Sequence, residues 1–141
     1  MKDNVTAIIV GCGHRARDYA KTMVEYTDKI QIVALVDPDK HVRDISKNLF
    51  GVPEDMCFDN IDQVLKLGKI ADCVINGTMD SLHISTSIPF LKQGYDMLLE
   101  KPITNNAKDL QELKSVVDEY HNKIMLSLIH ISEPTRLALI S

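Results

Sequence analysis

The amino-terminal stretch VTAIIVGCGHRA, residues 5–16, runs from an apolar segment through two glycines into polar residues. Residues 5–10 are mostly β-branched or small apolar side chains, which predicts a buried strand. Gly11 and Gly13 predict a sharp turn, and the periodicity of residues 15–26 predicts a helix. The chain is therefore expected to begin with a strand, a glycine turn and a helix.

This turn has the G-x-G-x-x-A pattern of a dinucleotide phosphate site. Gly11 permits the tight turn, Gly13 lets a pyrophosphate approach the backbone, and Ala16 lets the helix pack closely on the sheet. The free N–H groups of a helix N-terminus attract phosphate oxygens. We expect Gly11, Gly13, His14 and Arg15 to bind a cofactor; the alternative is an ordinary glycine-rich turn.

An acidic residue follows the second apolar run, residues 31–36. In dinucleotide-binding units, a carboxylate at this position accepts hydrogen bonds from the adenosine ribose hydroxyls and repels a 2′-phosphate. Asp37 therefore favours NAD, although Lys40 and Arg43 leave NADP possible. The alternative is a simple turn in which Asp39 caps the following helix.

The rest of the chain alternates short Val- and Ile-rich runs with helical periodicity, which predicts an α/β fold with a doubly wound, mostly parallel Rossmann sheet flanked by helices. The near-continuous apolar strands indicate a sheet that is covered on both faces. Further strands are expected at 56–58, 71–76, 95–99 and from 123, and helices at 40–50, 60–67, 81–92 and 106–120. Apolar residues recur at helical spacing at Val42, Ile45 and Leu49, and an inward face is predicted for Leu110, Leu113, Val116 and Val117.

Polar residues also follow the fourth and fifth predicted strands, at 76–78 and 100–102. Ligands of open α/β sheets lie outside the carboxyl ends of the strands, so these residues and His83 are candidates for the site. Lys101 is held between Glu100 and a proline, where it could bind a substrate oxygen and share in proton transfer. A structural histidine and a solvated lysine are the alternatives.

The composition excludes several classes of protein. The 141 residues carry 16 Lys and Arg against 20 Asp and Glu, a net charge of −4, which argues against nucleic-acid binding and a basic membrane patch. No apolar stretch is long enough for a transmembrane helix, and the first apolar run is too short for the apolar region of a signal peptide, so neither is expected. The 3 cysteines form no metal or disulfide pattern. We expect a cytoplasmic protein without a metal site.

Four motifs resemble the Gfo/Idh/MocA oxidoreductase family: GCGHRA, LVDPDK, GTMDSLH and LLEKPIT, at residues 11–16, 35–40, 77–83 and 98–104. The resemblance implies a homo-oligomeric enzyme that transfers hydride between NAD(P) and a sugar, polyol or related substrate. It also implies a second, substrate-binding domain, which this chain lacks. Because that domain supplies an Asp and a His to the site, we expect this chain to bind cofactor weakly and to be inactive alone.

The resemblance also assigns roles to individual residues. Lys101 looks like the catalytic lysine of the family, and Pro102 like the loop proline after it. Glu100 supports the same loop, and Thr78 and His83 resemble the cofactor-contacting pair. Two other interpretations are a non-catalytic dinucleotide-binding or sensor module and a Rossmann-like methyltransferase. The usual glycine pattern of such methyltransferases differs from the one in this chain.

The end of the chain departs from this pattern. LSLIHISEPTR, residues 126–136, resembles the conceptual translation of a sequencing-library adapter. We therefore expect a dinucleotide-binding Rossmann domain at residues 1–125 and a non-native tail at residues 126–141, in which no side chain has a functional role.

Overall fold

The computed structural model describes residues 5–13, 17–18, 20–22, 25, 30–78, 83–100, 107–127 and 137–140. Within these ranges the strands are β1 (Val5–Val10), β2 (Ile30–Val36), β3 (Cys57–Phe58), β4 (Cys73–Asn76), β5 (Asp96–Glu100), β6 (Ile124–Ser127) and β7 (Leu137–Ile140). The helices are α2 (Lys40–Phe50), α3 (Ile61–Leu65), α4 (His83–Lys92) and α5 (Ala107–Tyr120), with a 3-10 turn at Glu54–Met56. The predicted helix at 15–26 lies partly outside the described residues, and those described at 17–18, 20–22 and 25 are helical.

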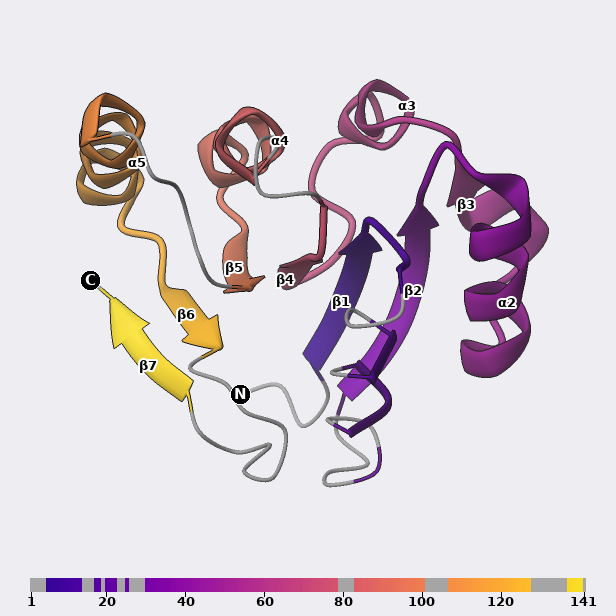
Figure 1. The fold of residues 1–141 in the computed structure, drawn as a ribbon. Helices are drawn as coiled ribbons and strands as arrows, with labels where there is room; N and C mark the ends of the chain where they lie inside the picture. The colour runs from indigo at the N-terminus through magenta and orange to yellow at the C-terminus, as the bar shows by residue number, and fades with distance from the viewer. Residues whose placement is uncertain are drawn as a thin grey trace.

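The described strands form one sheet in the order β3-β2-β1-β4-β5-β6-β7 (Figure 1). All pairs from β3 to β6 are parallel, and only β7 pairs antiparallel, with β6. From β1 the chain moves outward to β2 and β3, then returns to pair β4 with the other edge of β1. The strand order therefore reverses between β1 and β4, where open α/β sheets bind their ligands. The doubly wound Rossmann sheet predicted from the sequence is confirmed.

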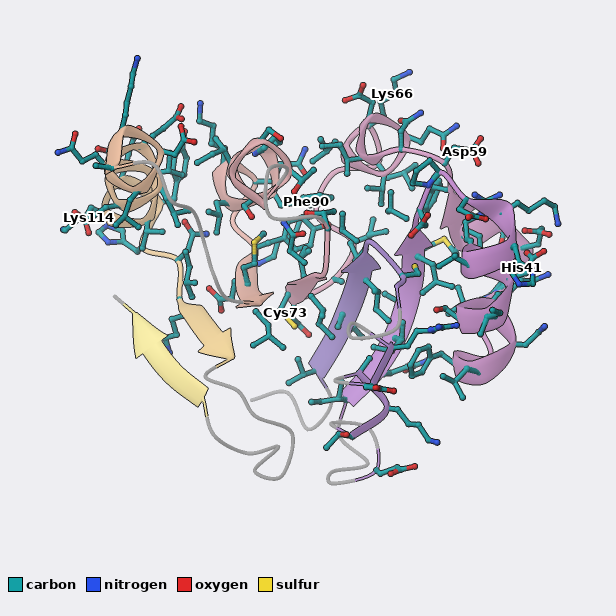
Figure 2. The ribbon with its side chains drawn as sticks, in the orientation of Figure 1. His41, Asp59, Lys66, Cys73, Phe90 and Lys114 are labelled. Atoms are coloured by element: carbon teal, nitrogen blue, oxygen red, sulfur yellow. The ribbon has the colours of Figure 1, made fainter. Side chains whose placement is uncertain are left out.

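Figure 1 shows α3, α4 and α5 along one face of the sheet and α2 beside β2 and β3. On one face α3, α4 and α5 bury a cluster that includes Phe90 and Tyr95, whose rings meet edge to face with centroids 5.4 Å apart. On the other face α2 and Ala20 cover a second cluster, which includes Ile9 and Leu35. Figure 2 shows Phe90 between α4 and the strands. The strands are buried on both faces, which explains why their sequences are apolar without alternation.

Helix α2 is bounded by two local signals. The Asp39 carboxylate accepts from the N–H groups of His41 and Val42, and Gly51 ends the helix at φ +67°. The buried face of α2 differs from the face that carries the apolar residues at helical spacing. Ser46 is buried, whereas Ile45 and Leu49 are 40% and 46% exposed. Val42 still packs against the core. The buried face of α2 therefore carries the small Ser46 in place of Ile45 and Leu49.

Helix α5 buries Leu113, Val116 and Val117, as predicted. The prediction was wrong for Leu110, which is 49% exposed. Because α5 follows β5, its first turns lie at the carboxyl edge of the sheet, and Leu110 is one turn closer to that edge than the buried residues. The helix is followed by His121 at φ +59°.

Candidate cofactor site

The carboxyl ends of four strands are joined by backbone hydrogen bonds from the residues that follow them. The N–H of Gly11 donates to the carbonyl oxygen of Val36 at 2.8 Å, and that of Gly77 donates to Val10 at 2.8 Å. The N–H of Asp37 donates to Phe58 at 3.0 Å. The turns after β1, β2 and β4 therefore form one continuous rim at the point where the strand order reverses.

The two glycines of the turn have different roles. Gly11 has φ +81°, and a Cβ there would lie 2.7 Å from the backbone N of Thr78 and 2.8 Å from the backbone C of Gly77. Gly11 is thus required both by its conformation and by close packing against the turn after β4. A Cβ on Gly13 would meet nothing within 4 Å. Gly13 leaves its backbone open to a ligand, as a pyrophosphate site requires.

Asp37 is half-buried beside the glycine turn. One carboxylate oxygen, Oδ2, accepts from the Cys12 N–H at 2.8 Å, and the other, Oδ1, accepts from the Asp39 N–H at 2.8 Å. A carboxylate has about four acceptor positions, so each oxygen keeps capacity for one more donor. The carboxylate is therefore oriented by the backbone and still able to accept the two hydroxyls of a ribose.

The two cations behind Asp37 are paired with acidic residues. The Lys40 ammonium contacts Asp44 at 2.7 Å, and this hydrogen bond raises the pKa of Lys40. The Arg43 guanidinium donates to the carbonyl oxygen of Asp37 at 2.6 Å and lies 3.0 Å from Asp59. Asp59 follows the end of β3 (Figure 2). Arg43 thereby holds the backbone after β2 and ties it to β3.

The turn after β4 is held by a polar network around the buried Asn76 side chain. Asn76 donates to the hydroxyls of Thr86 and Ser87 and accepts from the N–H and the hydroxyl of Thr78. Sequence reasoning identified Asn76 and Thr78 but missed Thr86 and Ser87. Two adjacent hydroxyl residues on a helix that faces the sheet were a signal, but only the structure shows that they meet the end of β4.

Cys12 lies inside the turn but is not a reactive thiol. Its side chain is fully buried, and burial, reinforced by the negative charge of Asp37, raises the pKa of Cys12 from 9.0 to about 12. The thiol is therefore protonated at neutral pH and packs as a small apolar group.

The remaining predicted site residues are described only in part. Helix α4 begins at His83 and β5 ends at Glu100, but the orientation of these two side chains is not described. The other four, His14, Arg15, Lys101 and Pro102, lie outside the described residues.

Two general features of the described ranges bear on function. His, Cys, Asp and Glu side chains there do not gather in groups of three that could hold a metal ion. Every helix in these ranges is also too short or too polar to span a bilayer.

A doubly wound parallel sheet, with a glycine turn and an acidic residue at its reversal point, defines a Rossmann domain of the dinucleotide-binding class. The model of one protein family matches residues 5–128: the Gfo/Idh/MocA oxidoreductase family, NAD-binding Rossmann fold. The chain belongs to this family, as its motifs suggested. A comparison with curated protein sequences finds no match.

Solved structures with similar folds include scyllo-inositol dehydrogenase from Lactobacillus casei, with TM-score 0.80, 20% identity and coverage of 90% of this chain and 37% of that one. The WlbA dehydrogenase from Bordetella pertussis, in complex with NADH and UDP-GlcNAcA, has TM-score 0.79, 19% identity and coverage of 88% and 37%. A variant of KijD10, a 3-ketoreductase from Actinomadura kijaniata in complex with TDP-benzene and NADP, has TM-score 0.75, 18% identity and coverage of 88% and 38%. The chain thus spans little more than a third of the length of each of these proteins.

Proposed function

We propose that this chain is the cofactor-binding domain of an oxidoreductase that transfers hydride between NAD and a sugar, polyol or related substrate. The observation that carries the proposal is the Asp37 carboxylate, which is fixed by two backbone N–H groups and keeps two acceptor positions beside the open backbone of Gly13. Membership of an NAD-binding oxidoreductase family supports it. The solved structures in complex with NADH and a nucleotide sugar support the substrate class.

Within this proposal, the protein holds each part of the cofactor separately. Asp37 accepts the adenosine ribose hydroxyls, and Gly13 and the helix N-terminus after it receive the pyrophosphate. A bound nicotinamide supplies or accepts the hydride. NAD is preferred to NADP because a 2′-phosphate would meet the charge of Asp37, while Lys40 and Arg43 are already paired with Asp44 and Asp59.

We further propose that Lys101 is the catalytic lysine, with Thr78, His83, Glu100 and Pro102 at the same edge. Lys101 directly follows Glu100, the last residue of β5, and β5 pairs with β4 through Leu99 and Asn76. The proposed role is to bind the reacting substrate oxygen and to hold or release its proton.

Calorimetry of this chain with NAD and NADP tests the cofactor assignment. We expect NAD to bind more tightly than NADP, and Asp37→Ala to weaken NAD binding about tenfold or more, because a hydrogen bond to a charged group contributes about 1.5–3 kcal/mol. Asp118→Ala is the matched control, since this exposed acid on α5 pairs with Lys114 and lies away from the proposed site. Equal NAD affinity of wild type and Asp37→Ala would contradict the proposal.

The catalytic assignment needs a second experiment. In this chain, Lys101→Ala should leave NAD affinity unchanged; in a protein that also carries a substrate domain, it should abolish hydride transfer. Full hydride transfer by that variant would contradict the catalytic role of Lys101, whereas a lack of hydride transfer in the unsubstituted two-domain protein would favour the non-catalytic module. Sugar-dependent NAD reduction by the 141-residue chain alone would contradict the proposal that a second domain completes the site.

We also propose that the chain consists of a Rossmann domain at residues 1–125 and a non-native tail at residues 126–141. Its support is the sequence of the tail and the family match, which ends at residue 128. Leu137–Ile140 nevertheless pairs with β6. A chain that ends at residue 127 should bind NAD as the whole chain does; loss of binding would show that the tail belongs to the domain.

A further inference from the structure

Asn76 is a polar side chain at a position where the sheet is otherwise apolar. It is the last residue of β4, pairs with Val10 of β1, and is 1% exposed. Burying a carboxamide costs free energy unless its donors and acceptor are satisfied. The position of this residue therefore depends on its partners.

Those partners come from both sides of the turn. The Asn76 amide nitrogen donates to Thr86 Oγ1 at 2.9 Å and to Ser87 Oγ at 2.8 Å. Its oxygen accepts from the backbone N–H of Thr78 at 3.1 Å and from the Thr78 hydroxyl at 2.7 Å. The hydroxyl groups can donate or accept, but a backbone N–H can only donate. The Thr78 N–H therefore fixes the orientation of the carboxamide.

Thr78 is consequently held from two directions. Asn76 connects it to α4, and the Thr78 hydroxyl also lies 3.3 Å from Thr86 Oγ1. From the other side, Gly11 packs so closely that a Cβ there would lie 2.7 Å from the Thr78 backbone. The turn after β4 is therefore clamped between helix α4 and the glycine turn.

We infer that Asn76, Thr86 and Ser87 form a positioning network that sets Thr78 for the nicotinamide half of the cofactor. The inference rests on the proposed function. In a doubly wound sheet each half binds one mononucleotide, and β4 begins the half opposite Asp37. Asp37 thus serves the adenosine half and the network serves the other half. Thr86 and Ser87 determine cofactor affinity through Asn76, without contacting the cofactor.

Calorimetry of the whole chain with NAD and with AMP separates the two halves. Asn76→Leu keeps the size of the side chain and removes all of its hydrogen bonds, so we expect the Kd for NAD to rise about tenfold and that for AMP to change less than about twofold. Ser87→Ala removes one bond, and we expect a rise of about threefold for NAD alone. This milder variant keeps the test informative if Asn76→Leu does not fold.

The matched control is Asn122→Leu. Asn122 is also a buried asparagine, and its amide donates to the carbonyl oxygens of Leu91 and Tyr95. It precedes β6, at the opposite edge of the sheet from the site. We expect this variant to be less stable but to bind NAD and AMP with an unchanged ratio of affinities.

Each outcome bears on one of the two proposals. If wild type binds neither NAD nor AMP, the proposed function fails and the inference with it. If wild type binds both, and Ser87→Ala weakens both equally or neither, the proposed function stands and the positioning network is overturned. A selective loss of NAD affinity in the Ser87 and Asn76 variants, absent in Asn122→Leu, supports it.

Discussion

At the scale of single residues, the two glycines of one turn have different effects: one is needed for stability and the other for binding. Gly11 is confined by its positive φ and by the backbone of the turn after β4, whereas Gly13 adjoins open space. The two glycines of this motif therefore meet two different physical requirements.

Gly11→Ala should lower the free energy of unfolding by about 3 kcal/mol, because it combines a strained conformation with a backbone overlap. Gly13→Ala should change that free energy by less than about 1 kcal/mol and still weaken NAD binding. Urea denaturation and calorimetry measure the two effects. Equal loss of stability in both variants would contradict the distinction.

The sequence allowed Gly11, Gly13 and Asp37 to be predicted because their positions relative to one strand, one turn and the next strand are local. The role of Ser87 could not be predicted in this way. Its hydroxyl meets Asn76 only because β4 and α4 pack together, and nothing in the spacing of the two residues specifies that contact.

At the scale of elements, the ends of the helices show how well local signals determine structure. Gly51 follows α2 at φ +67°, and His121 follows α5 at φ +59°. Both occupy the left-handed conformation that commonly ends a helix, but only glycine adopts it without steric cost.

His121→Gly should therefore stabilise the protein by about 1 kcal/mol, and Gly51→Ala should destabilise it by a similar amount. His121 is exposed, and a Cβ on Gly51 would meet nothing within 4 Å, so backbone conformation dominates both changes. Thermal denaturation of the two variants is the measurement. A lower melting temperature for His121→Gly would contradict this reasoning.

Helix boundaries and the alternation of strands and helices could be predicted, because apolar periodicity and caps are local signals. The faces of the helices were harder to predict. Leu110 and Leu113 are both apolar and close in sequence, yet only Leu113 of the two is buried. Burial depends on how far the neighbouring layer extends, which the periodicity of one helix does not encode.

At the scale of the whole molecule, the buried thiol of Cys12 and the partly buried thiol of Cys73 make stability depend on pH in the alkaline range. Burial, with the charges of Asp72 and Asp96, raises the pKa of Cys73 to about 11, and that of Cys12 is raised to about 12. Above pH 9.0, the ordinary thiol pKa, the unfolded chain loses these protons while the folded protein keeps them. The unfolded state then binds fewer protons, so stability falls as pH rises.

Each thiol should contribute a decline of about 1.4 kcal/mol per pH unit, ending near pH 11 for Cys73 and near pH 12 for Cys12. We expect Cys12→Ala to show a shallower decline than wild type in urea denaturation between pH 9.5 and 10.5, a window of about one unit inside this range. The control is Cys57→Ala, since Cys57 is less buried and should change the slope less. Identical slopes for wild type and Cys12→Ala would show that the thiol ionises equally in both states.

The backbone bonds from Gly11, Asp37 and Gly77 to the neighbouring strands also have a consequence for amide hydrogen exchange. By sequence these residues belong to loops, whose amides ordinarily exchange with solvent in local openings. Here each amide continues the parallel pairing of two neighbouring strands, so it can exchange only when that pairing opens. The backbone amides that a cofactor would meet should thus exchange as slowly as those in the core of the sheet. A ligand would then bind to a surface that is already ordered.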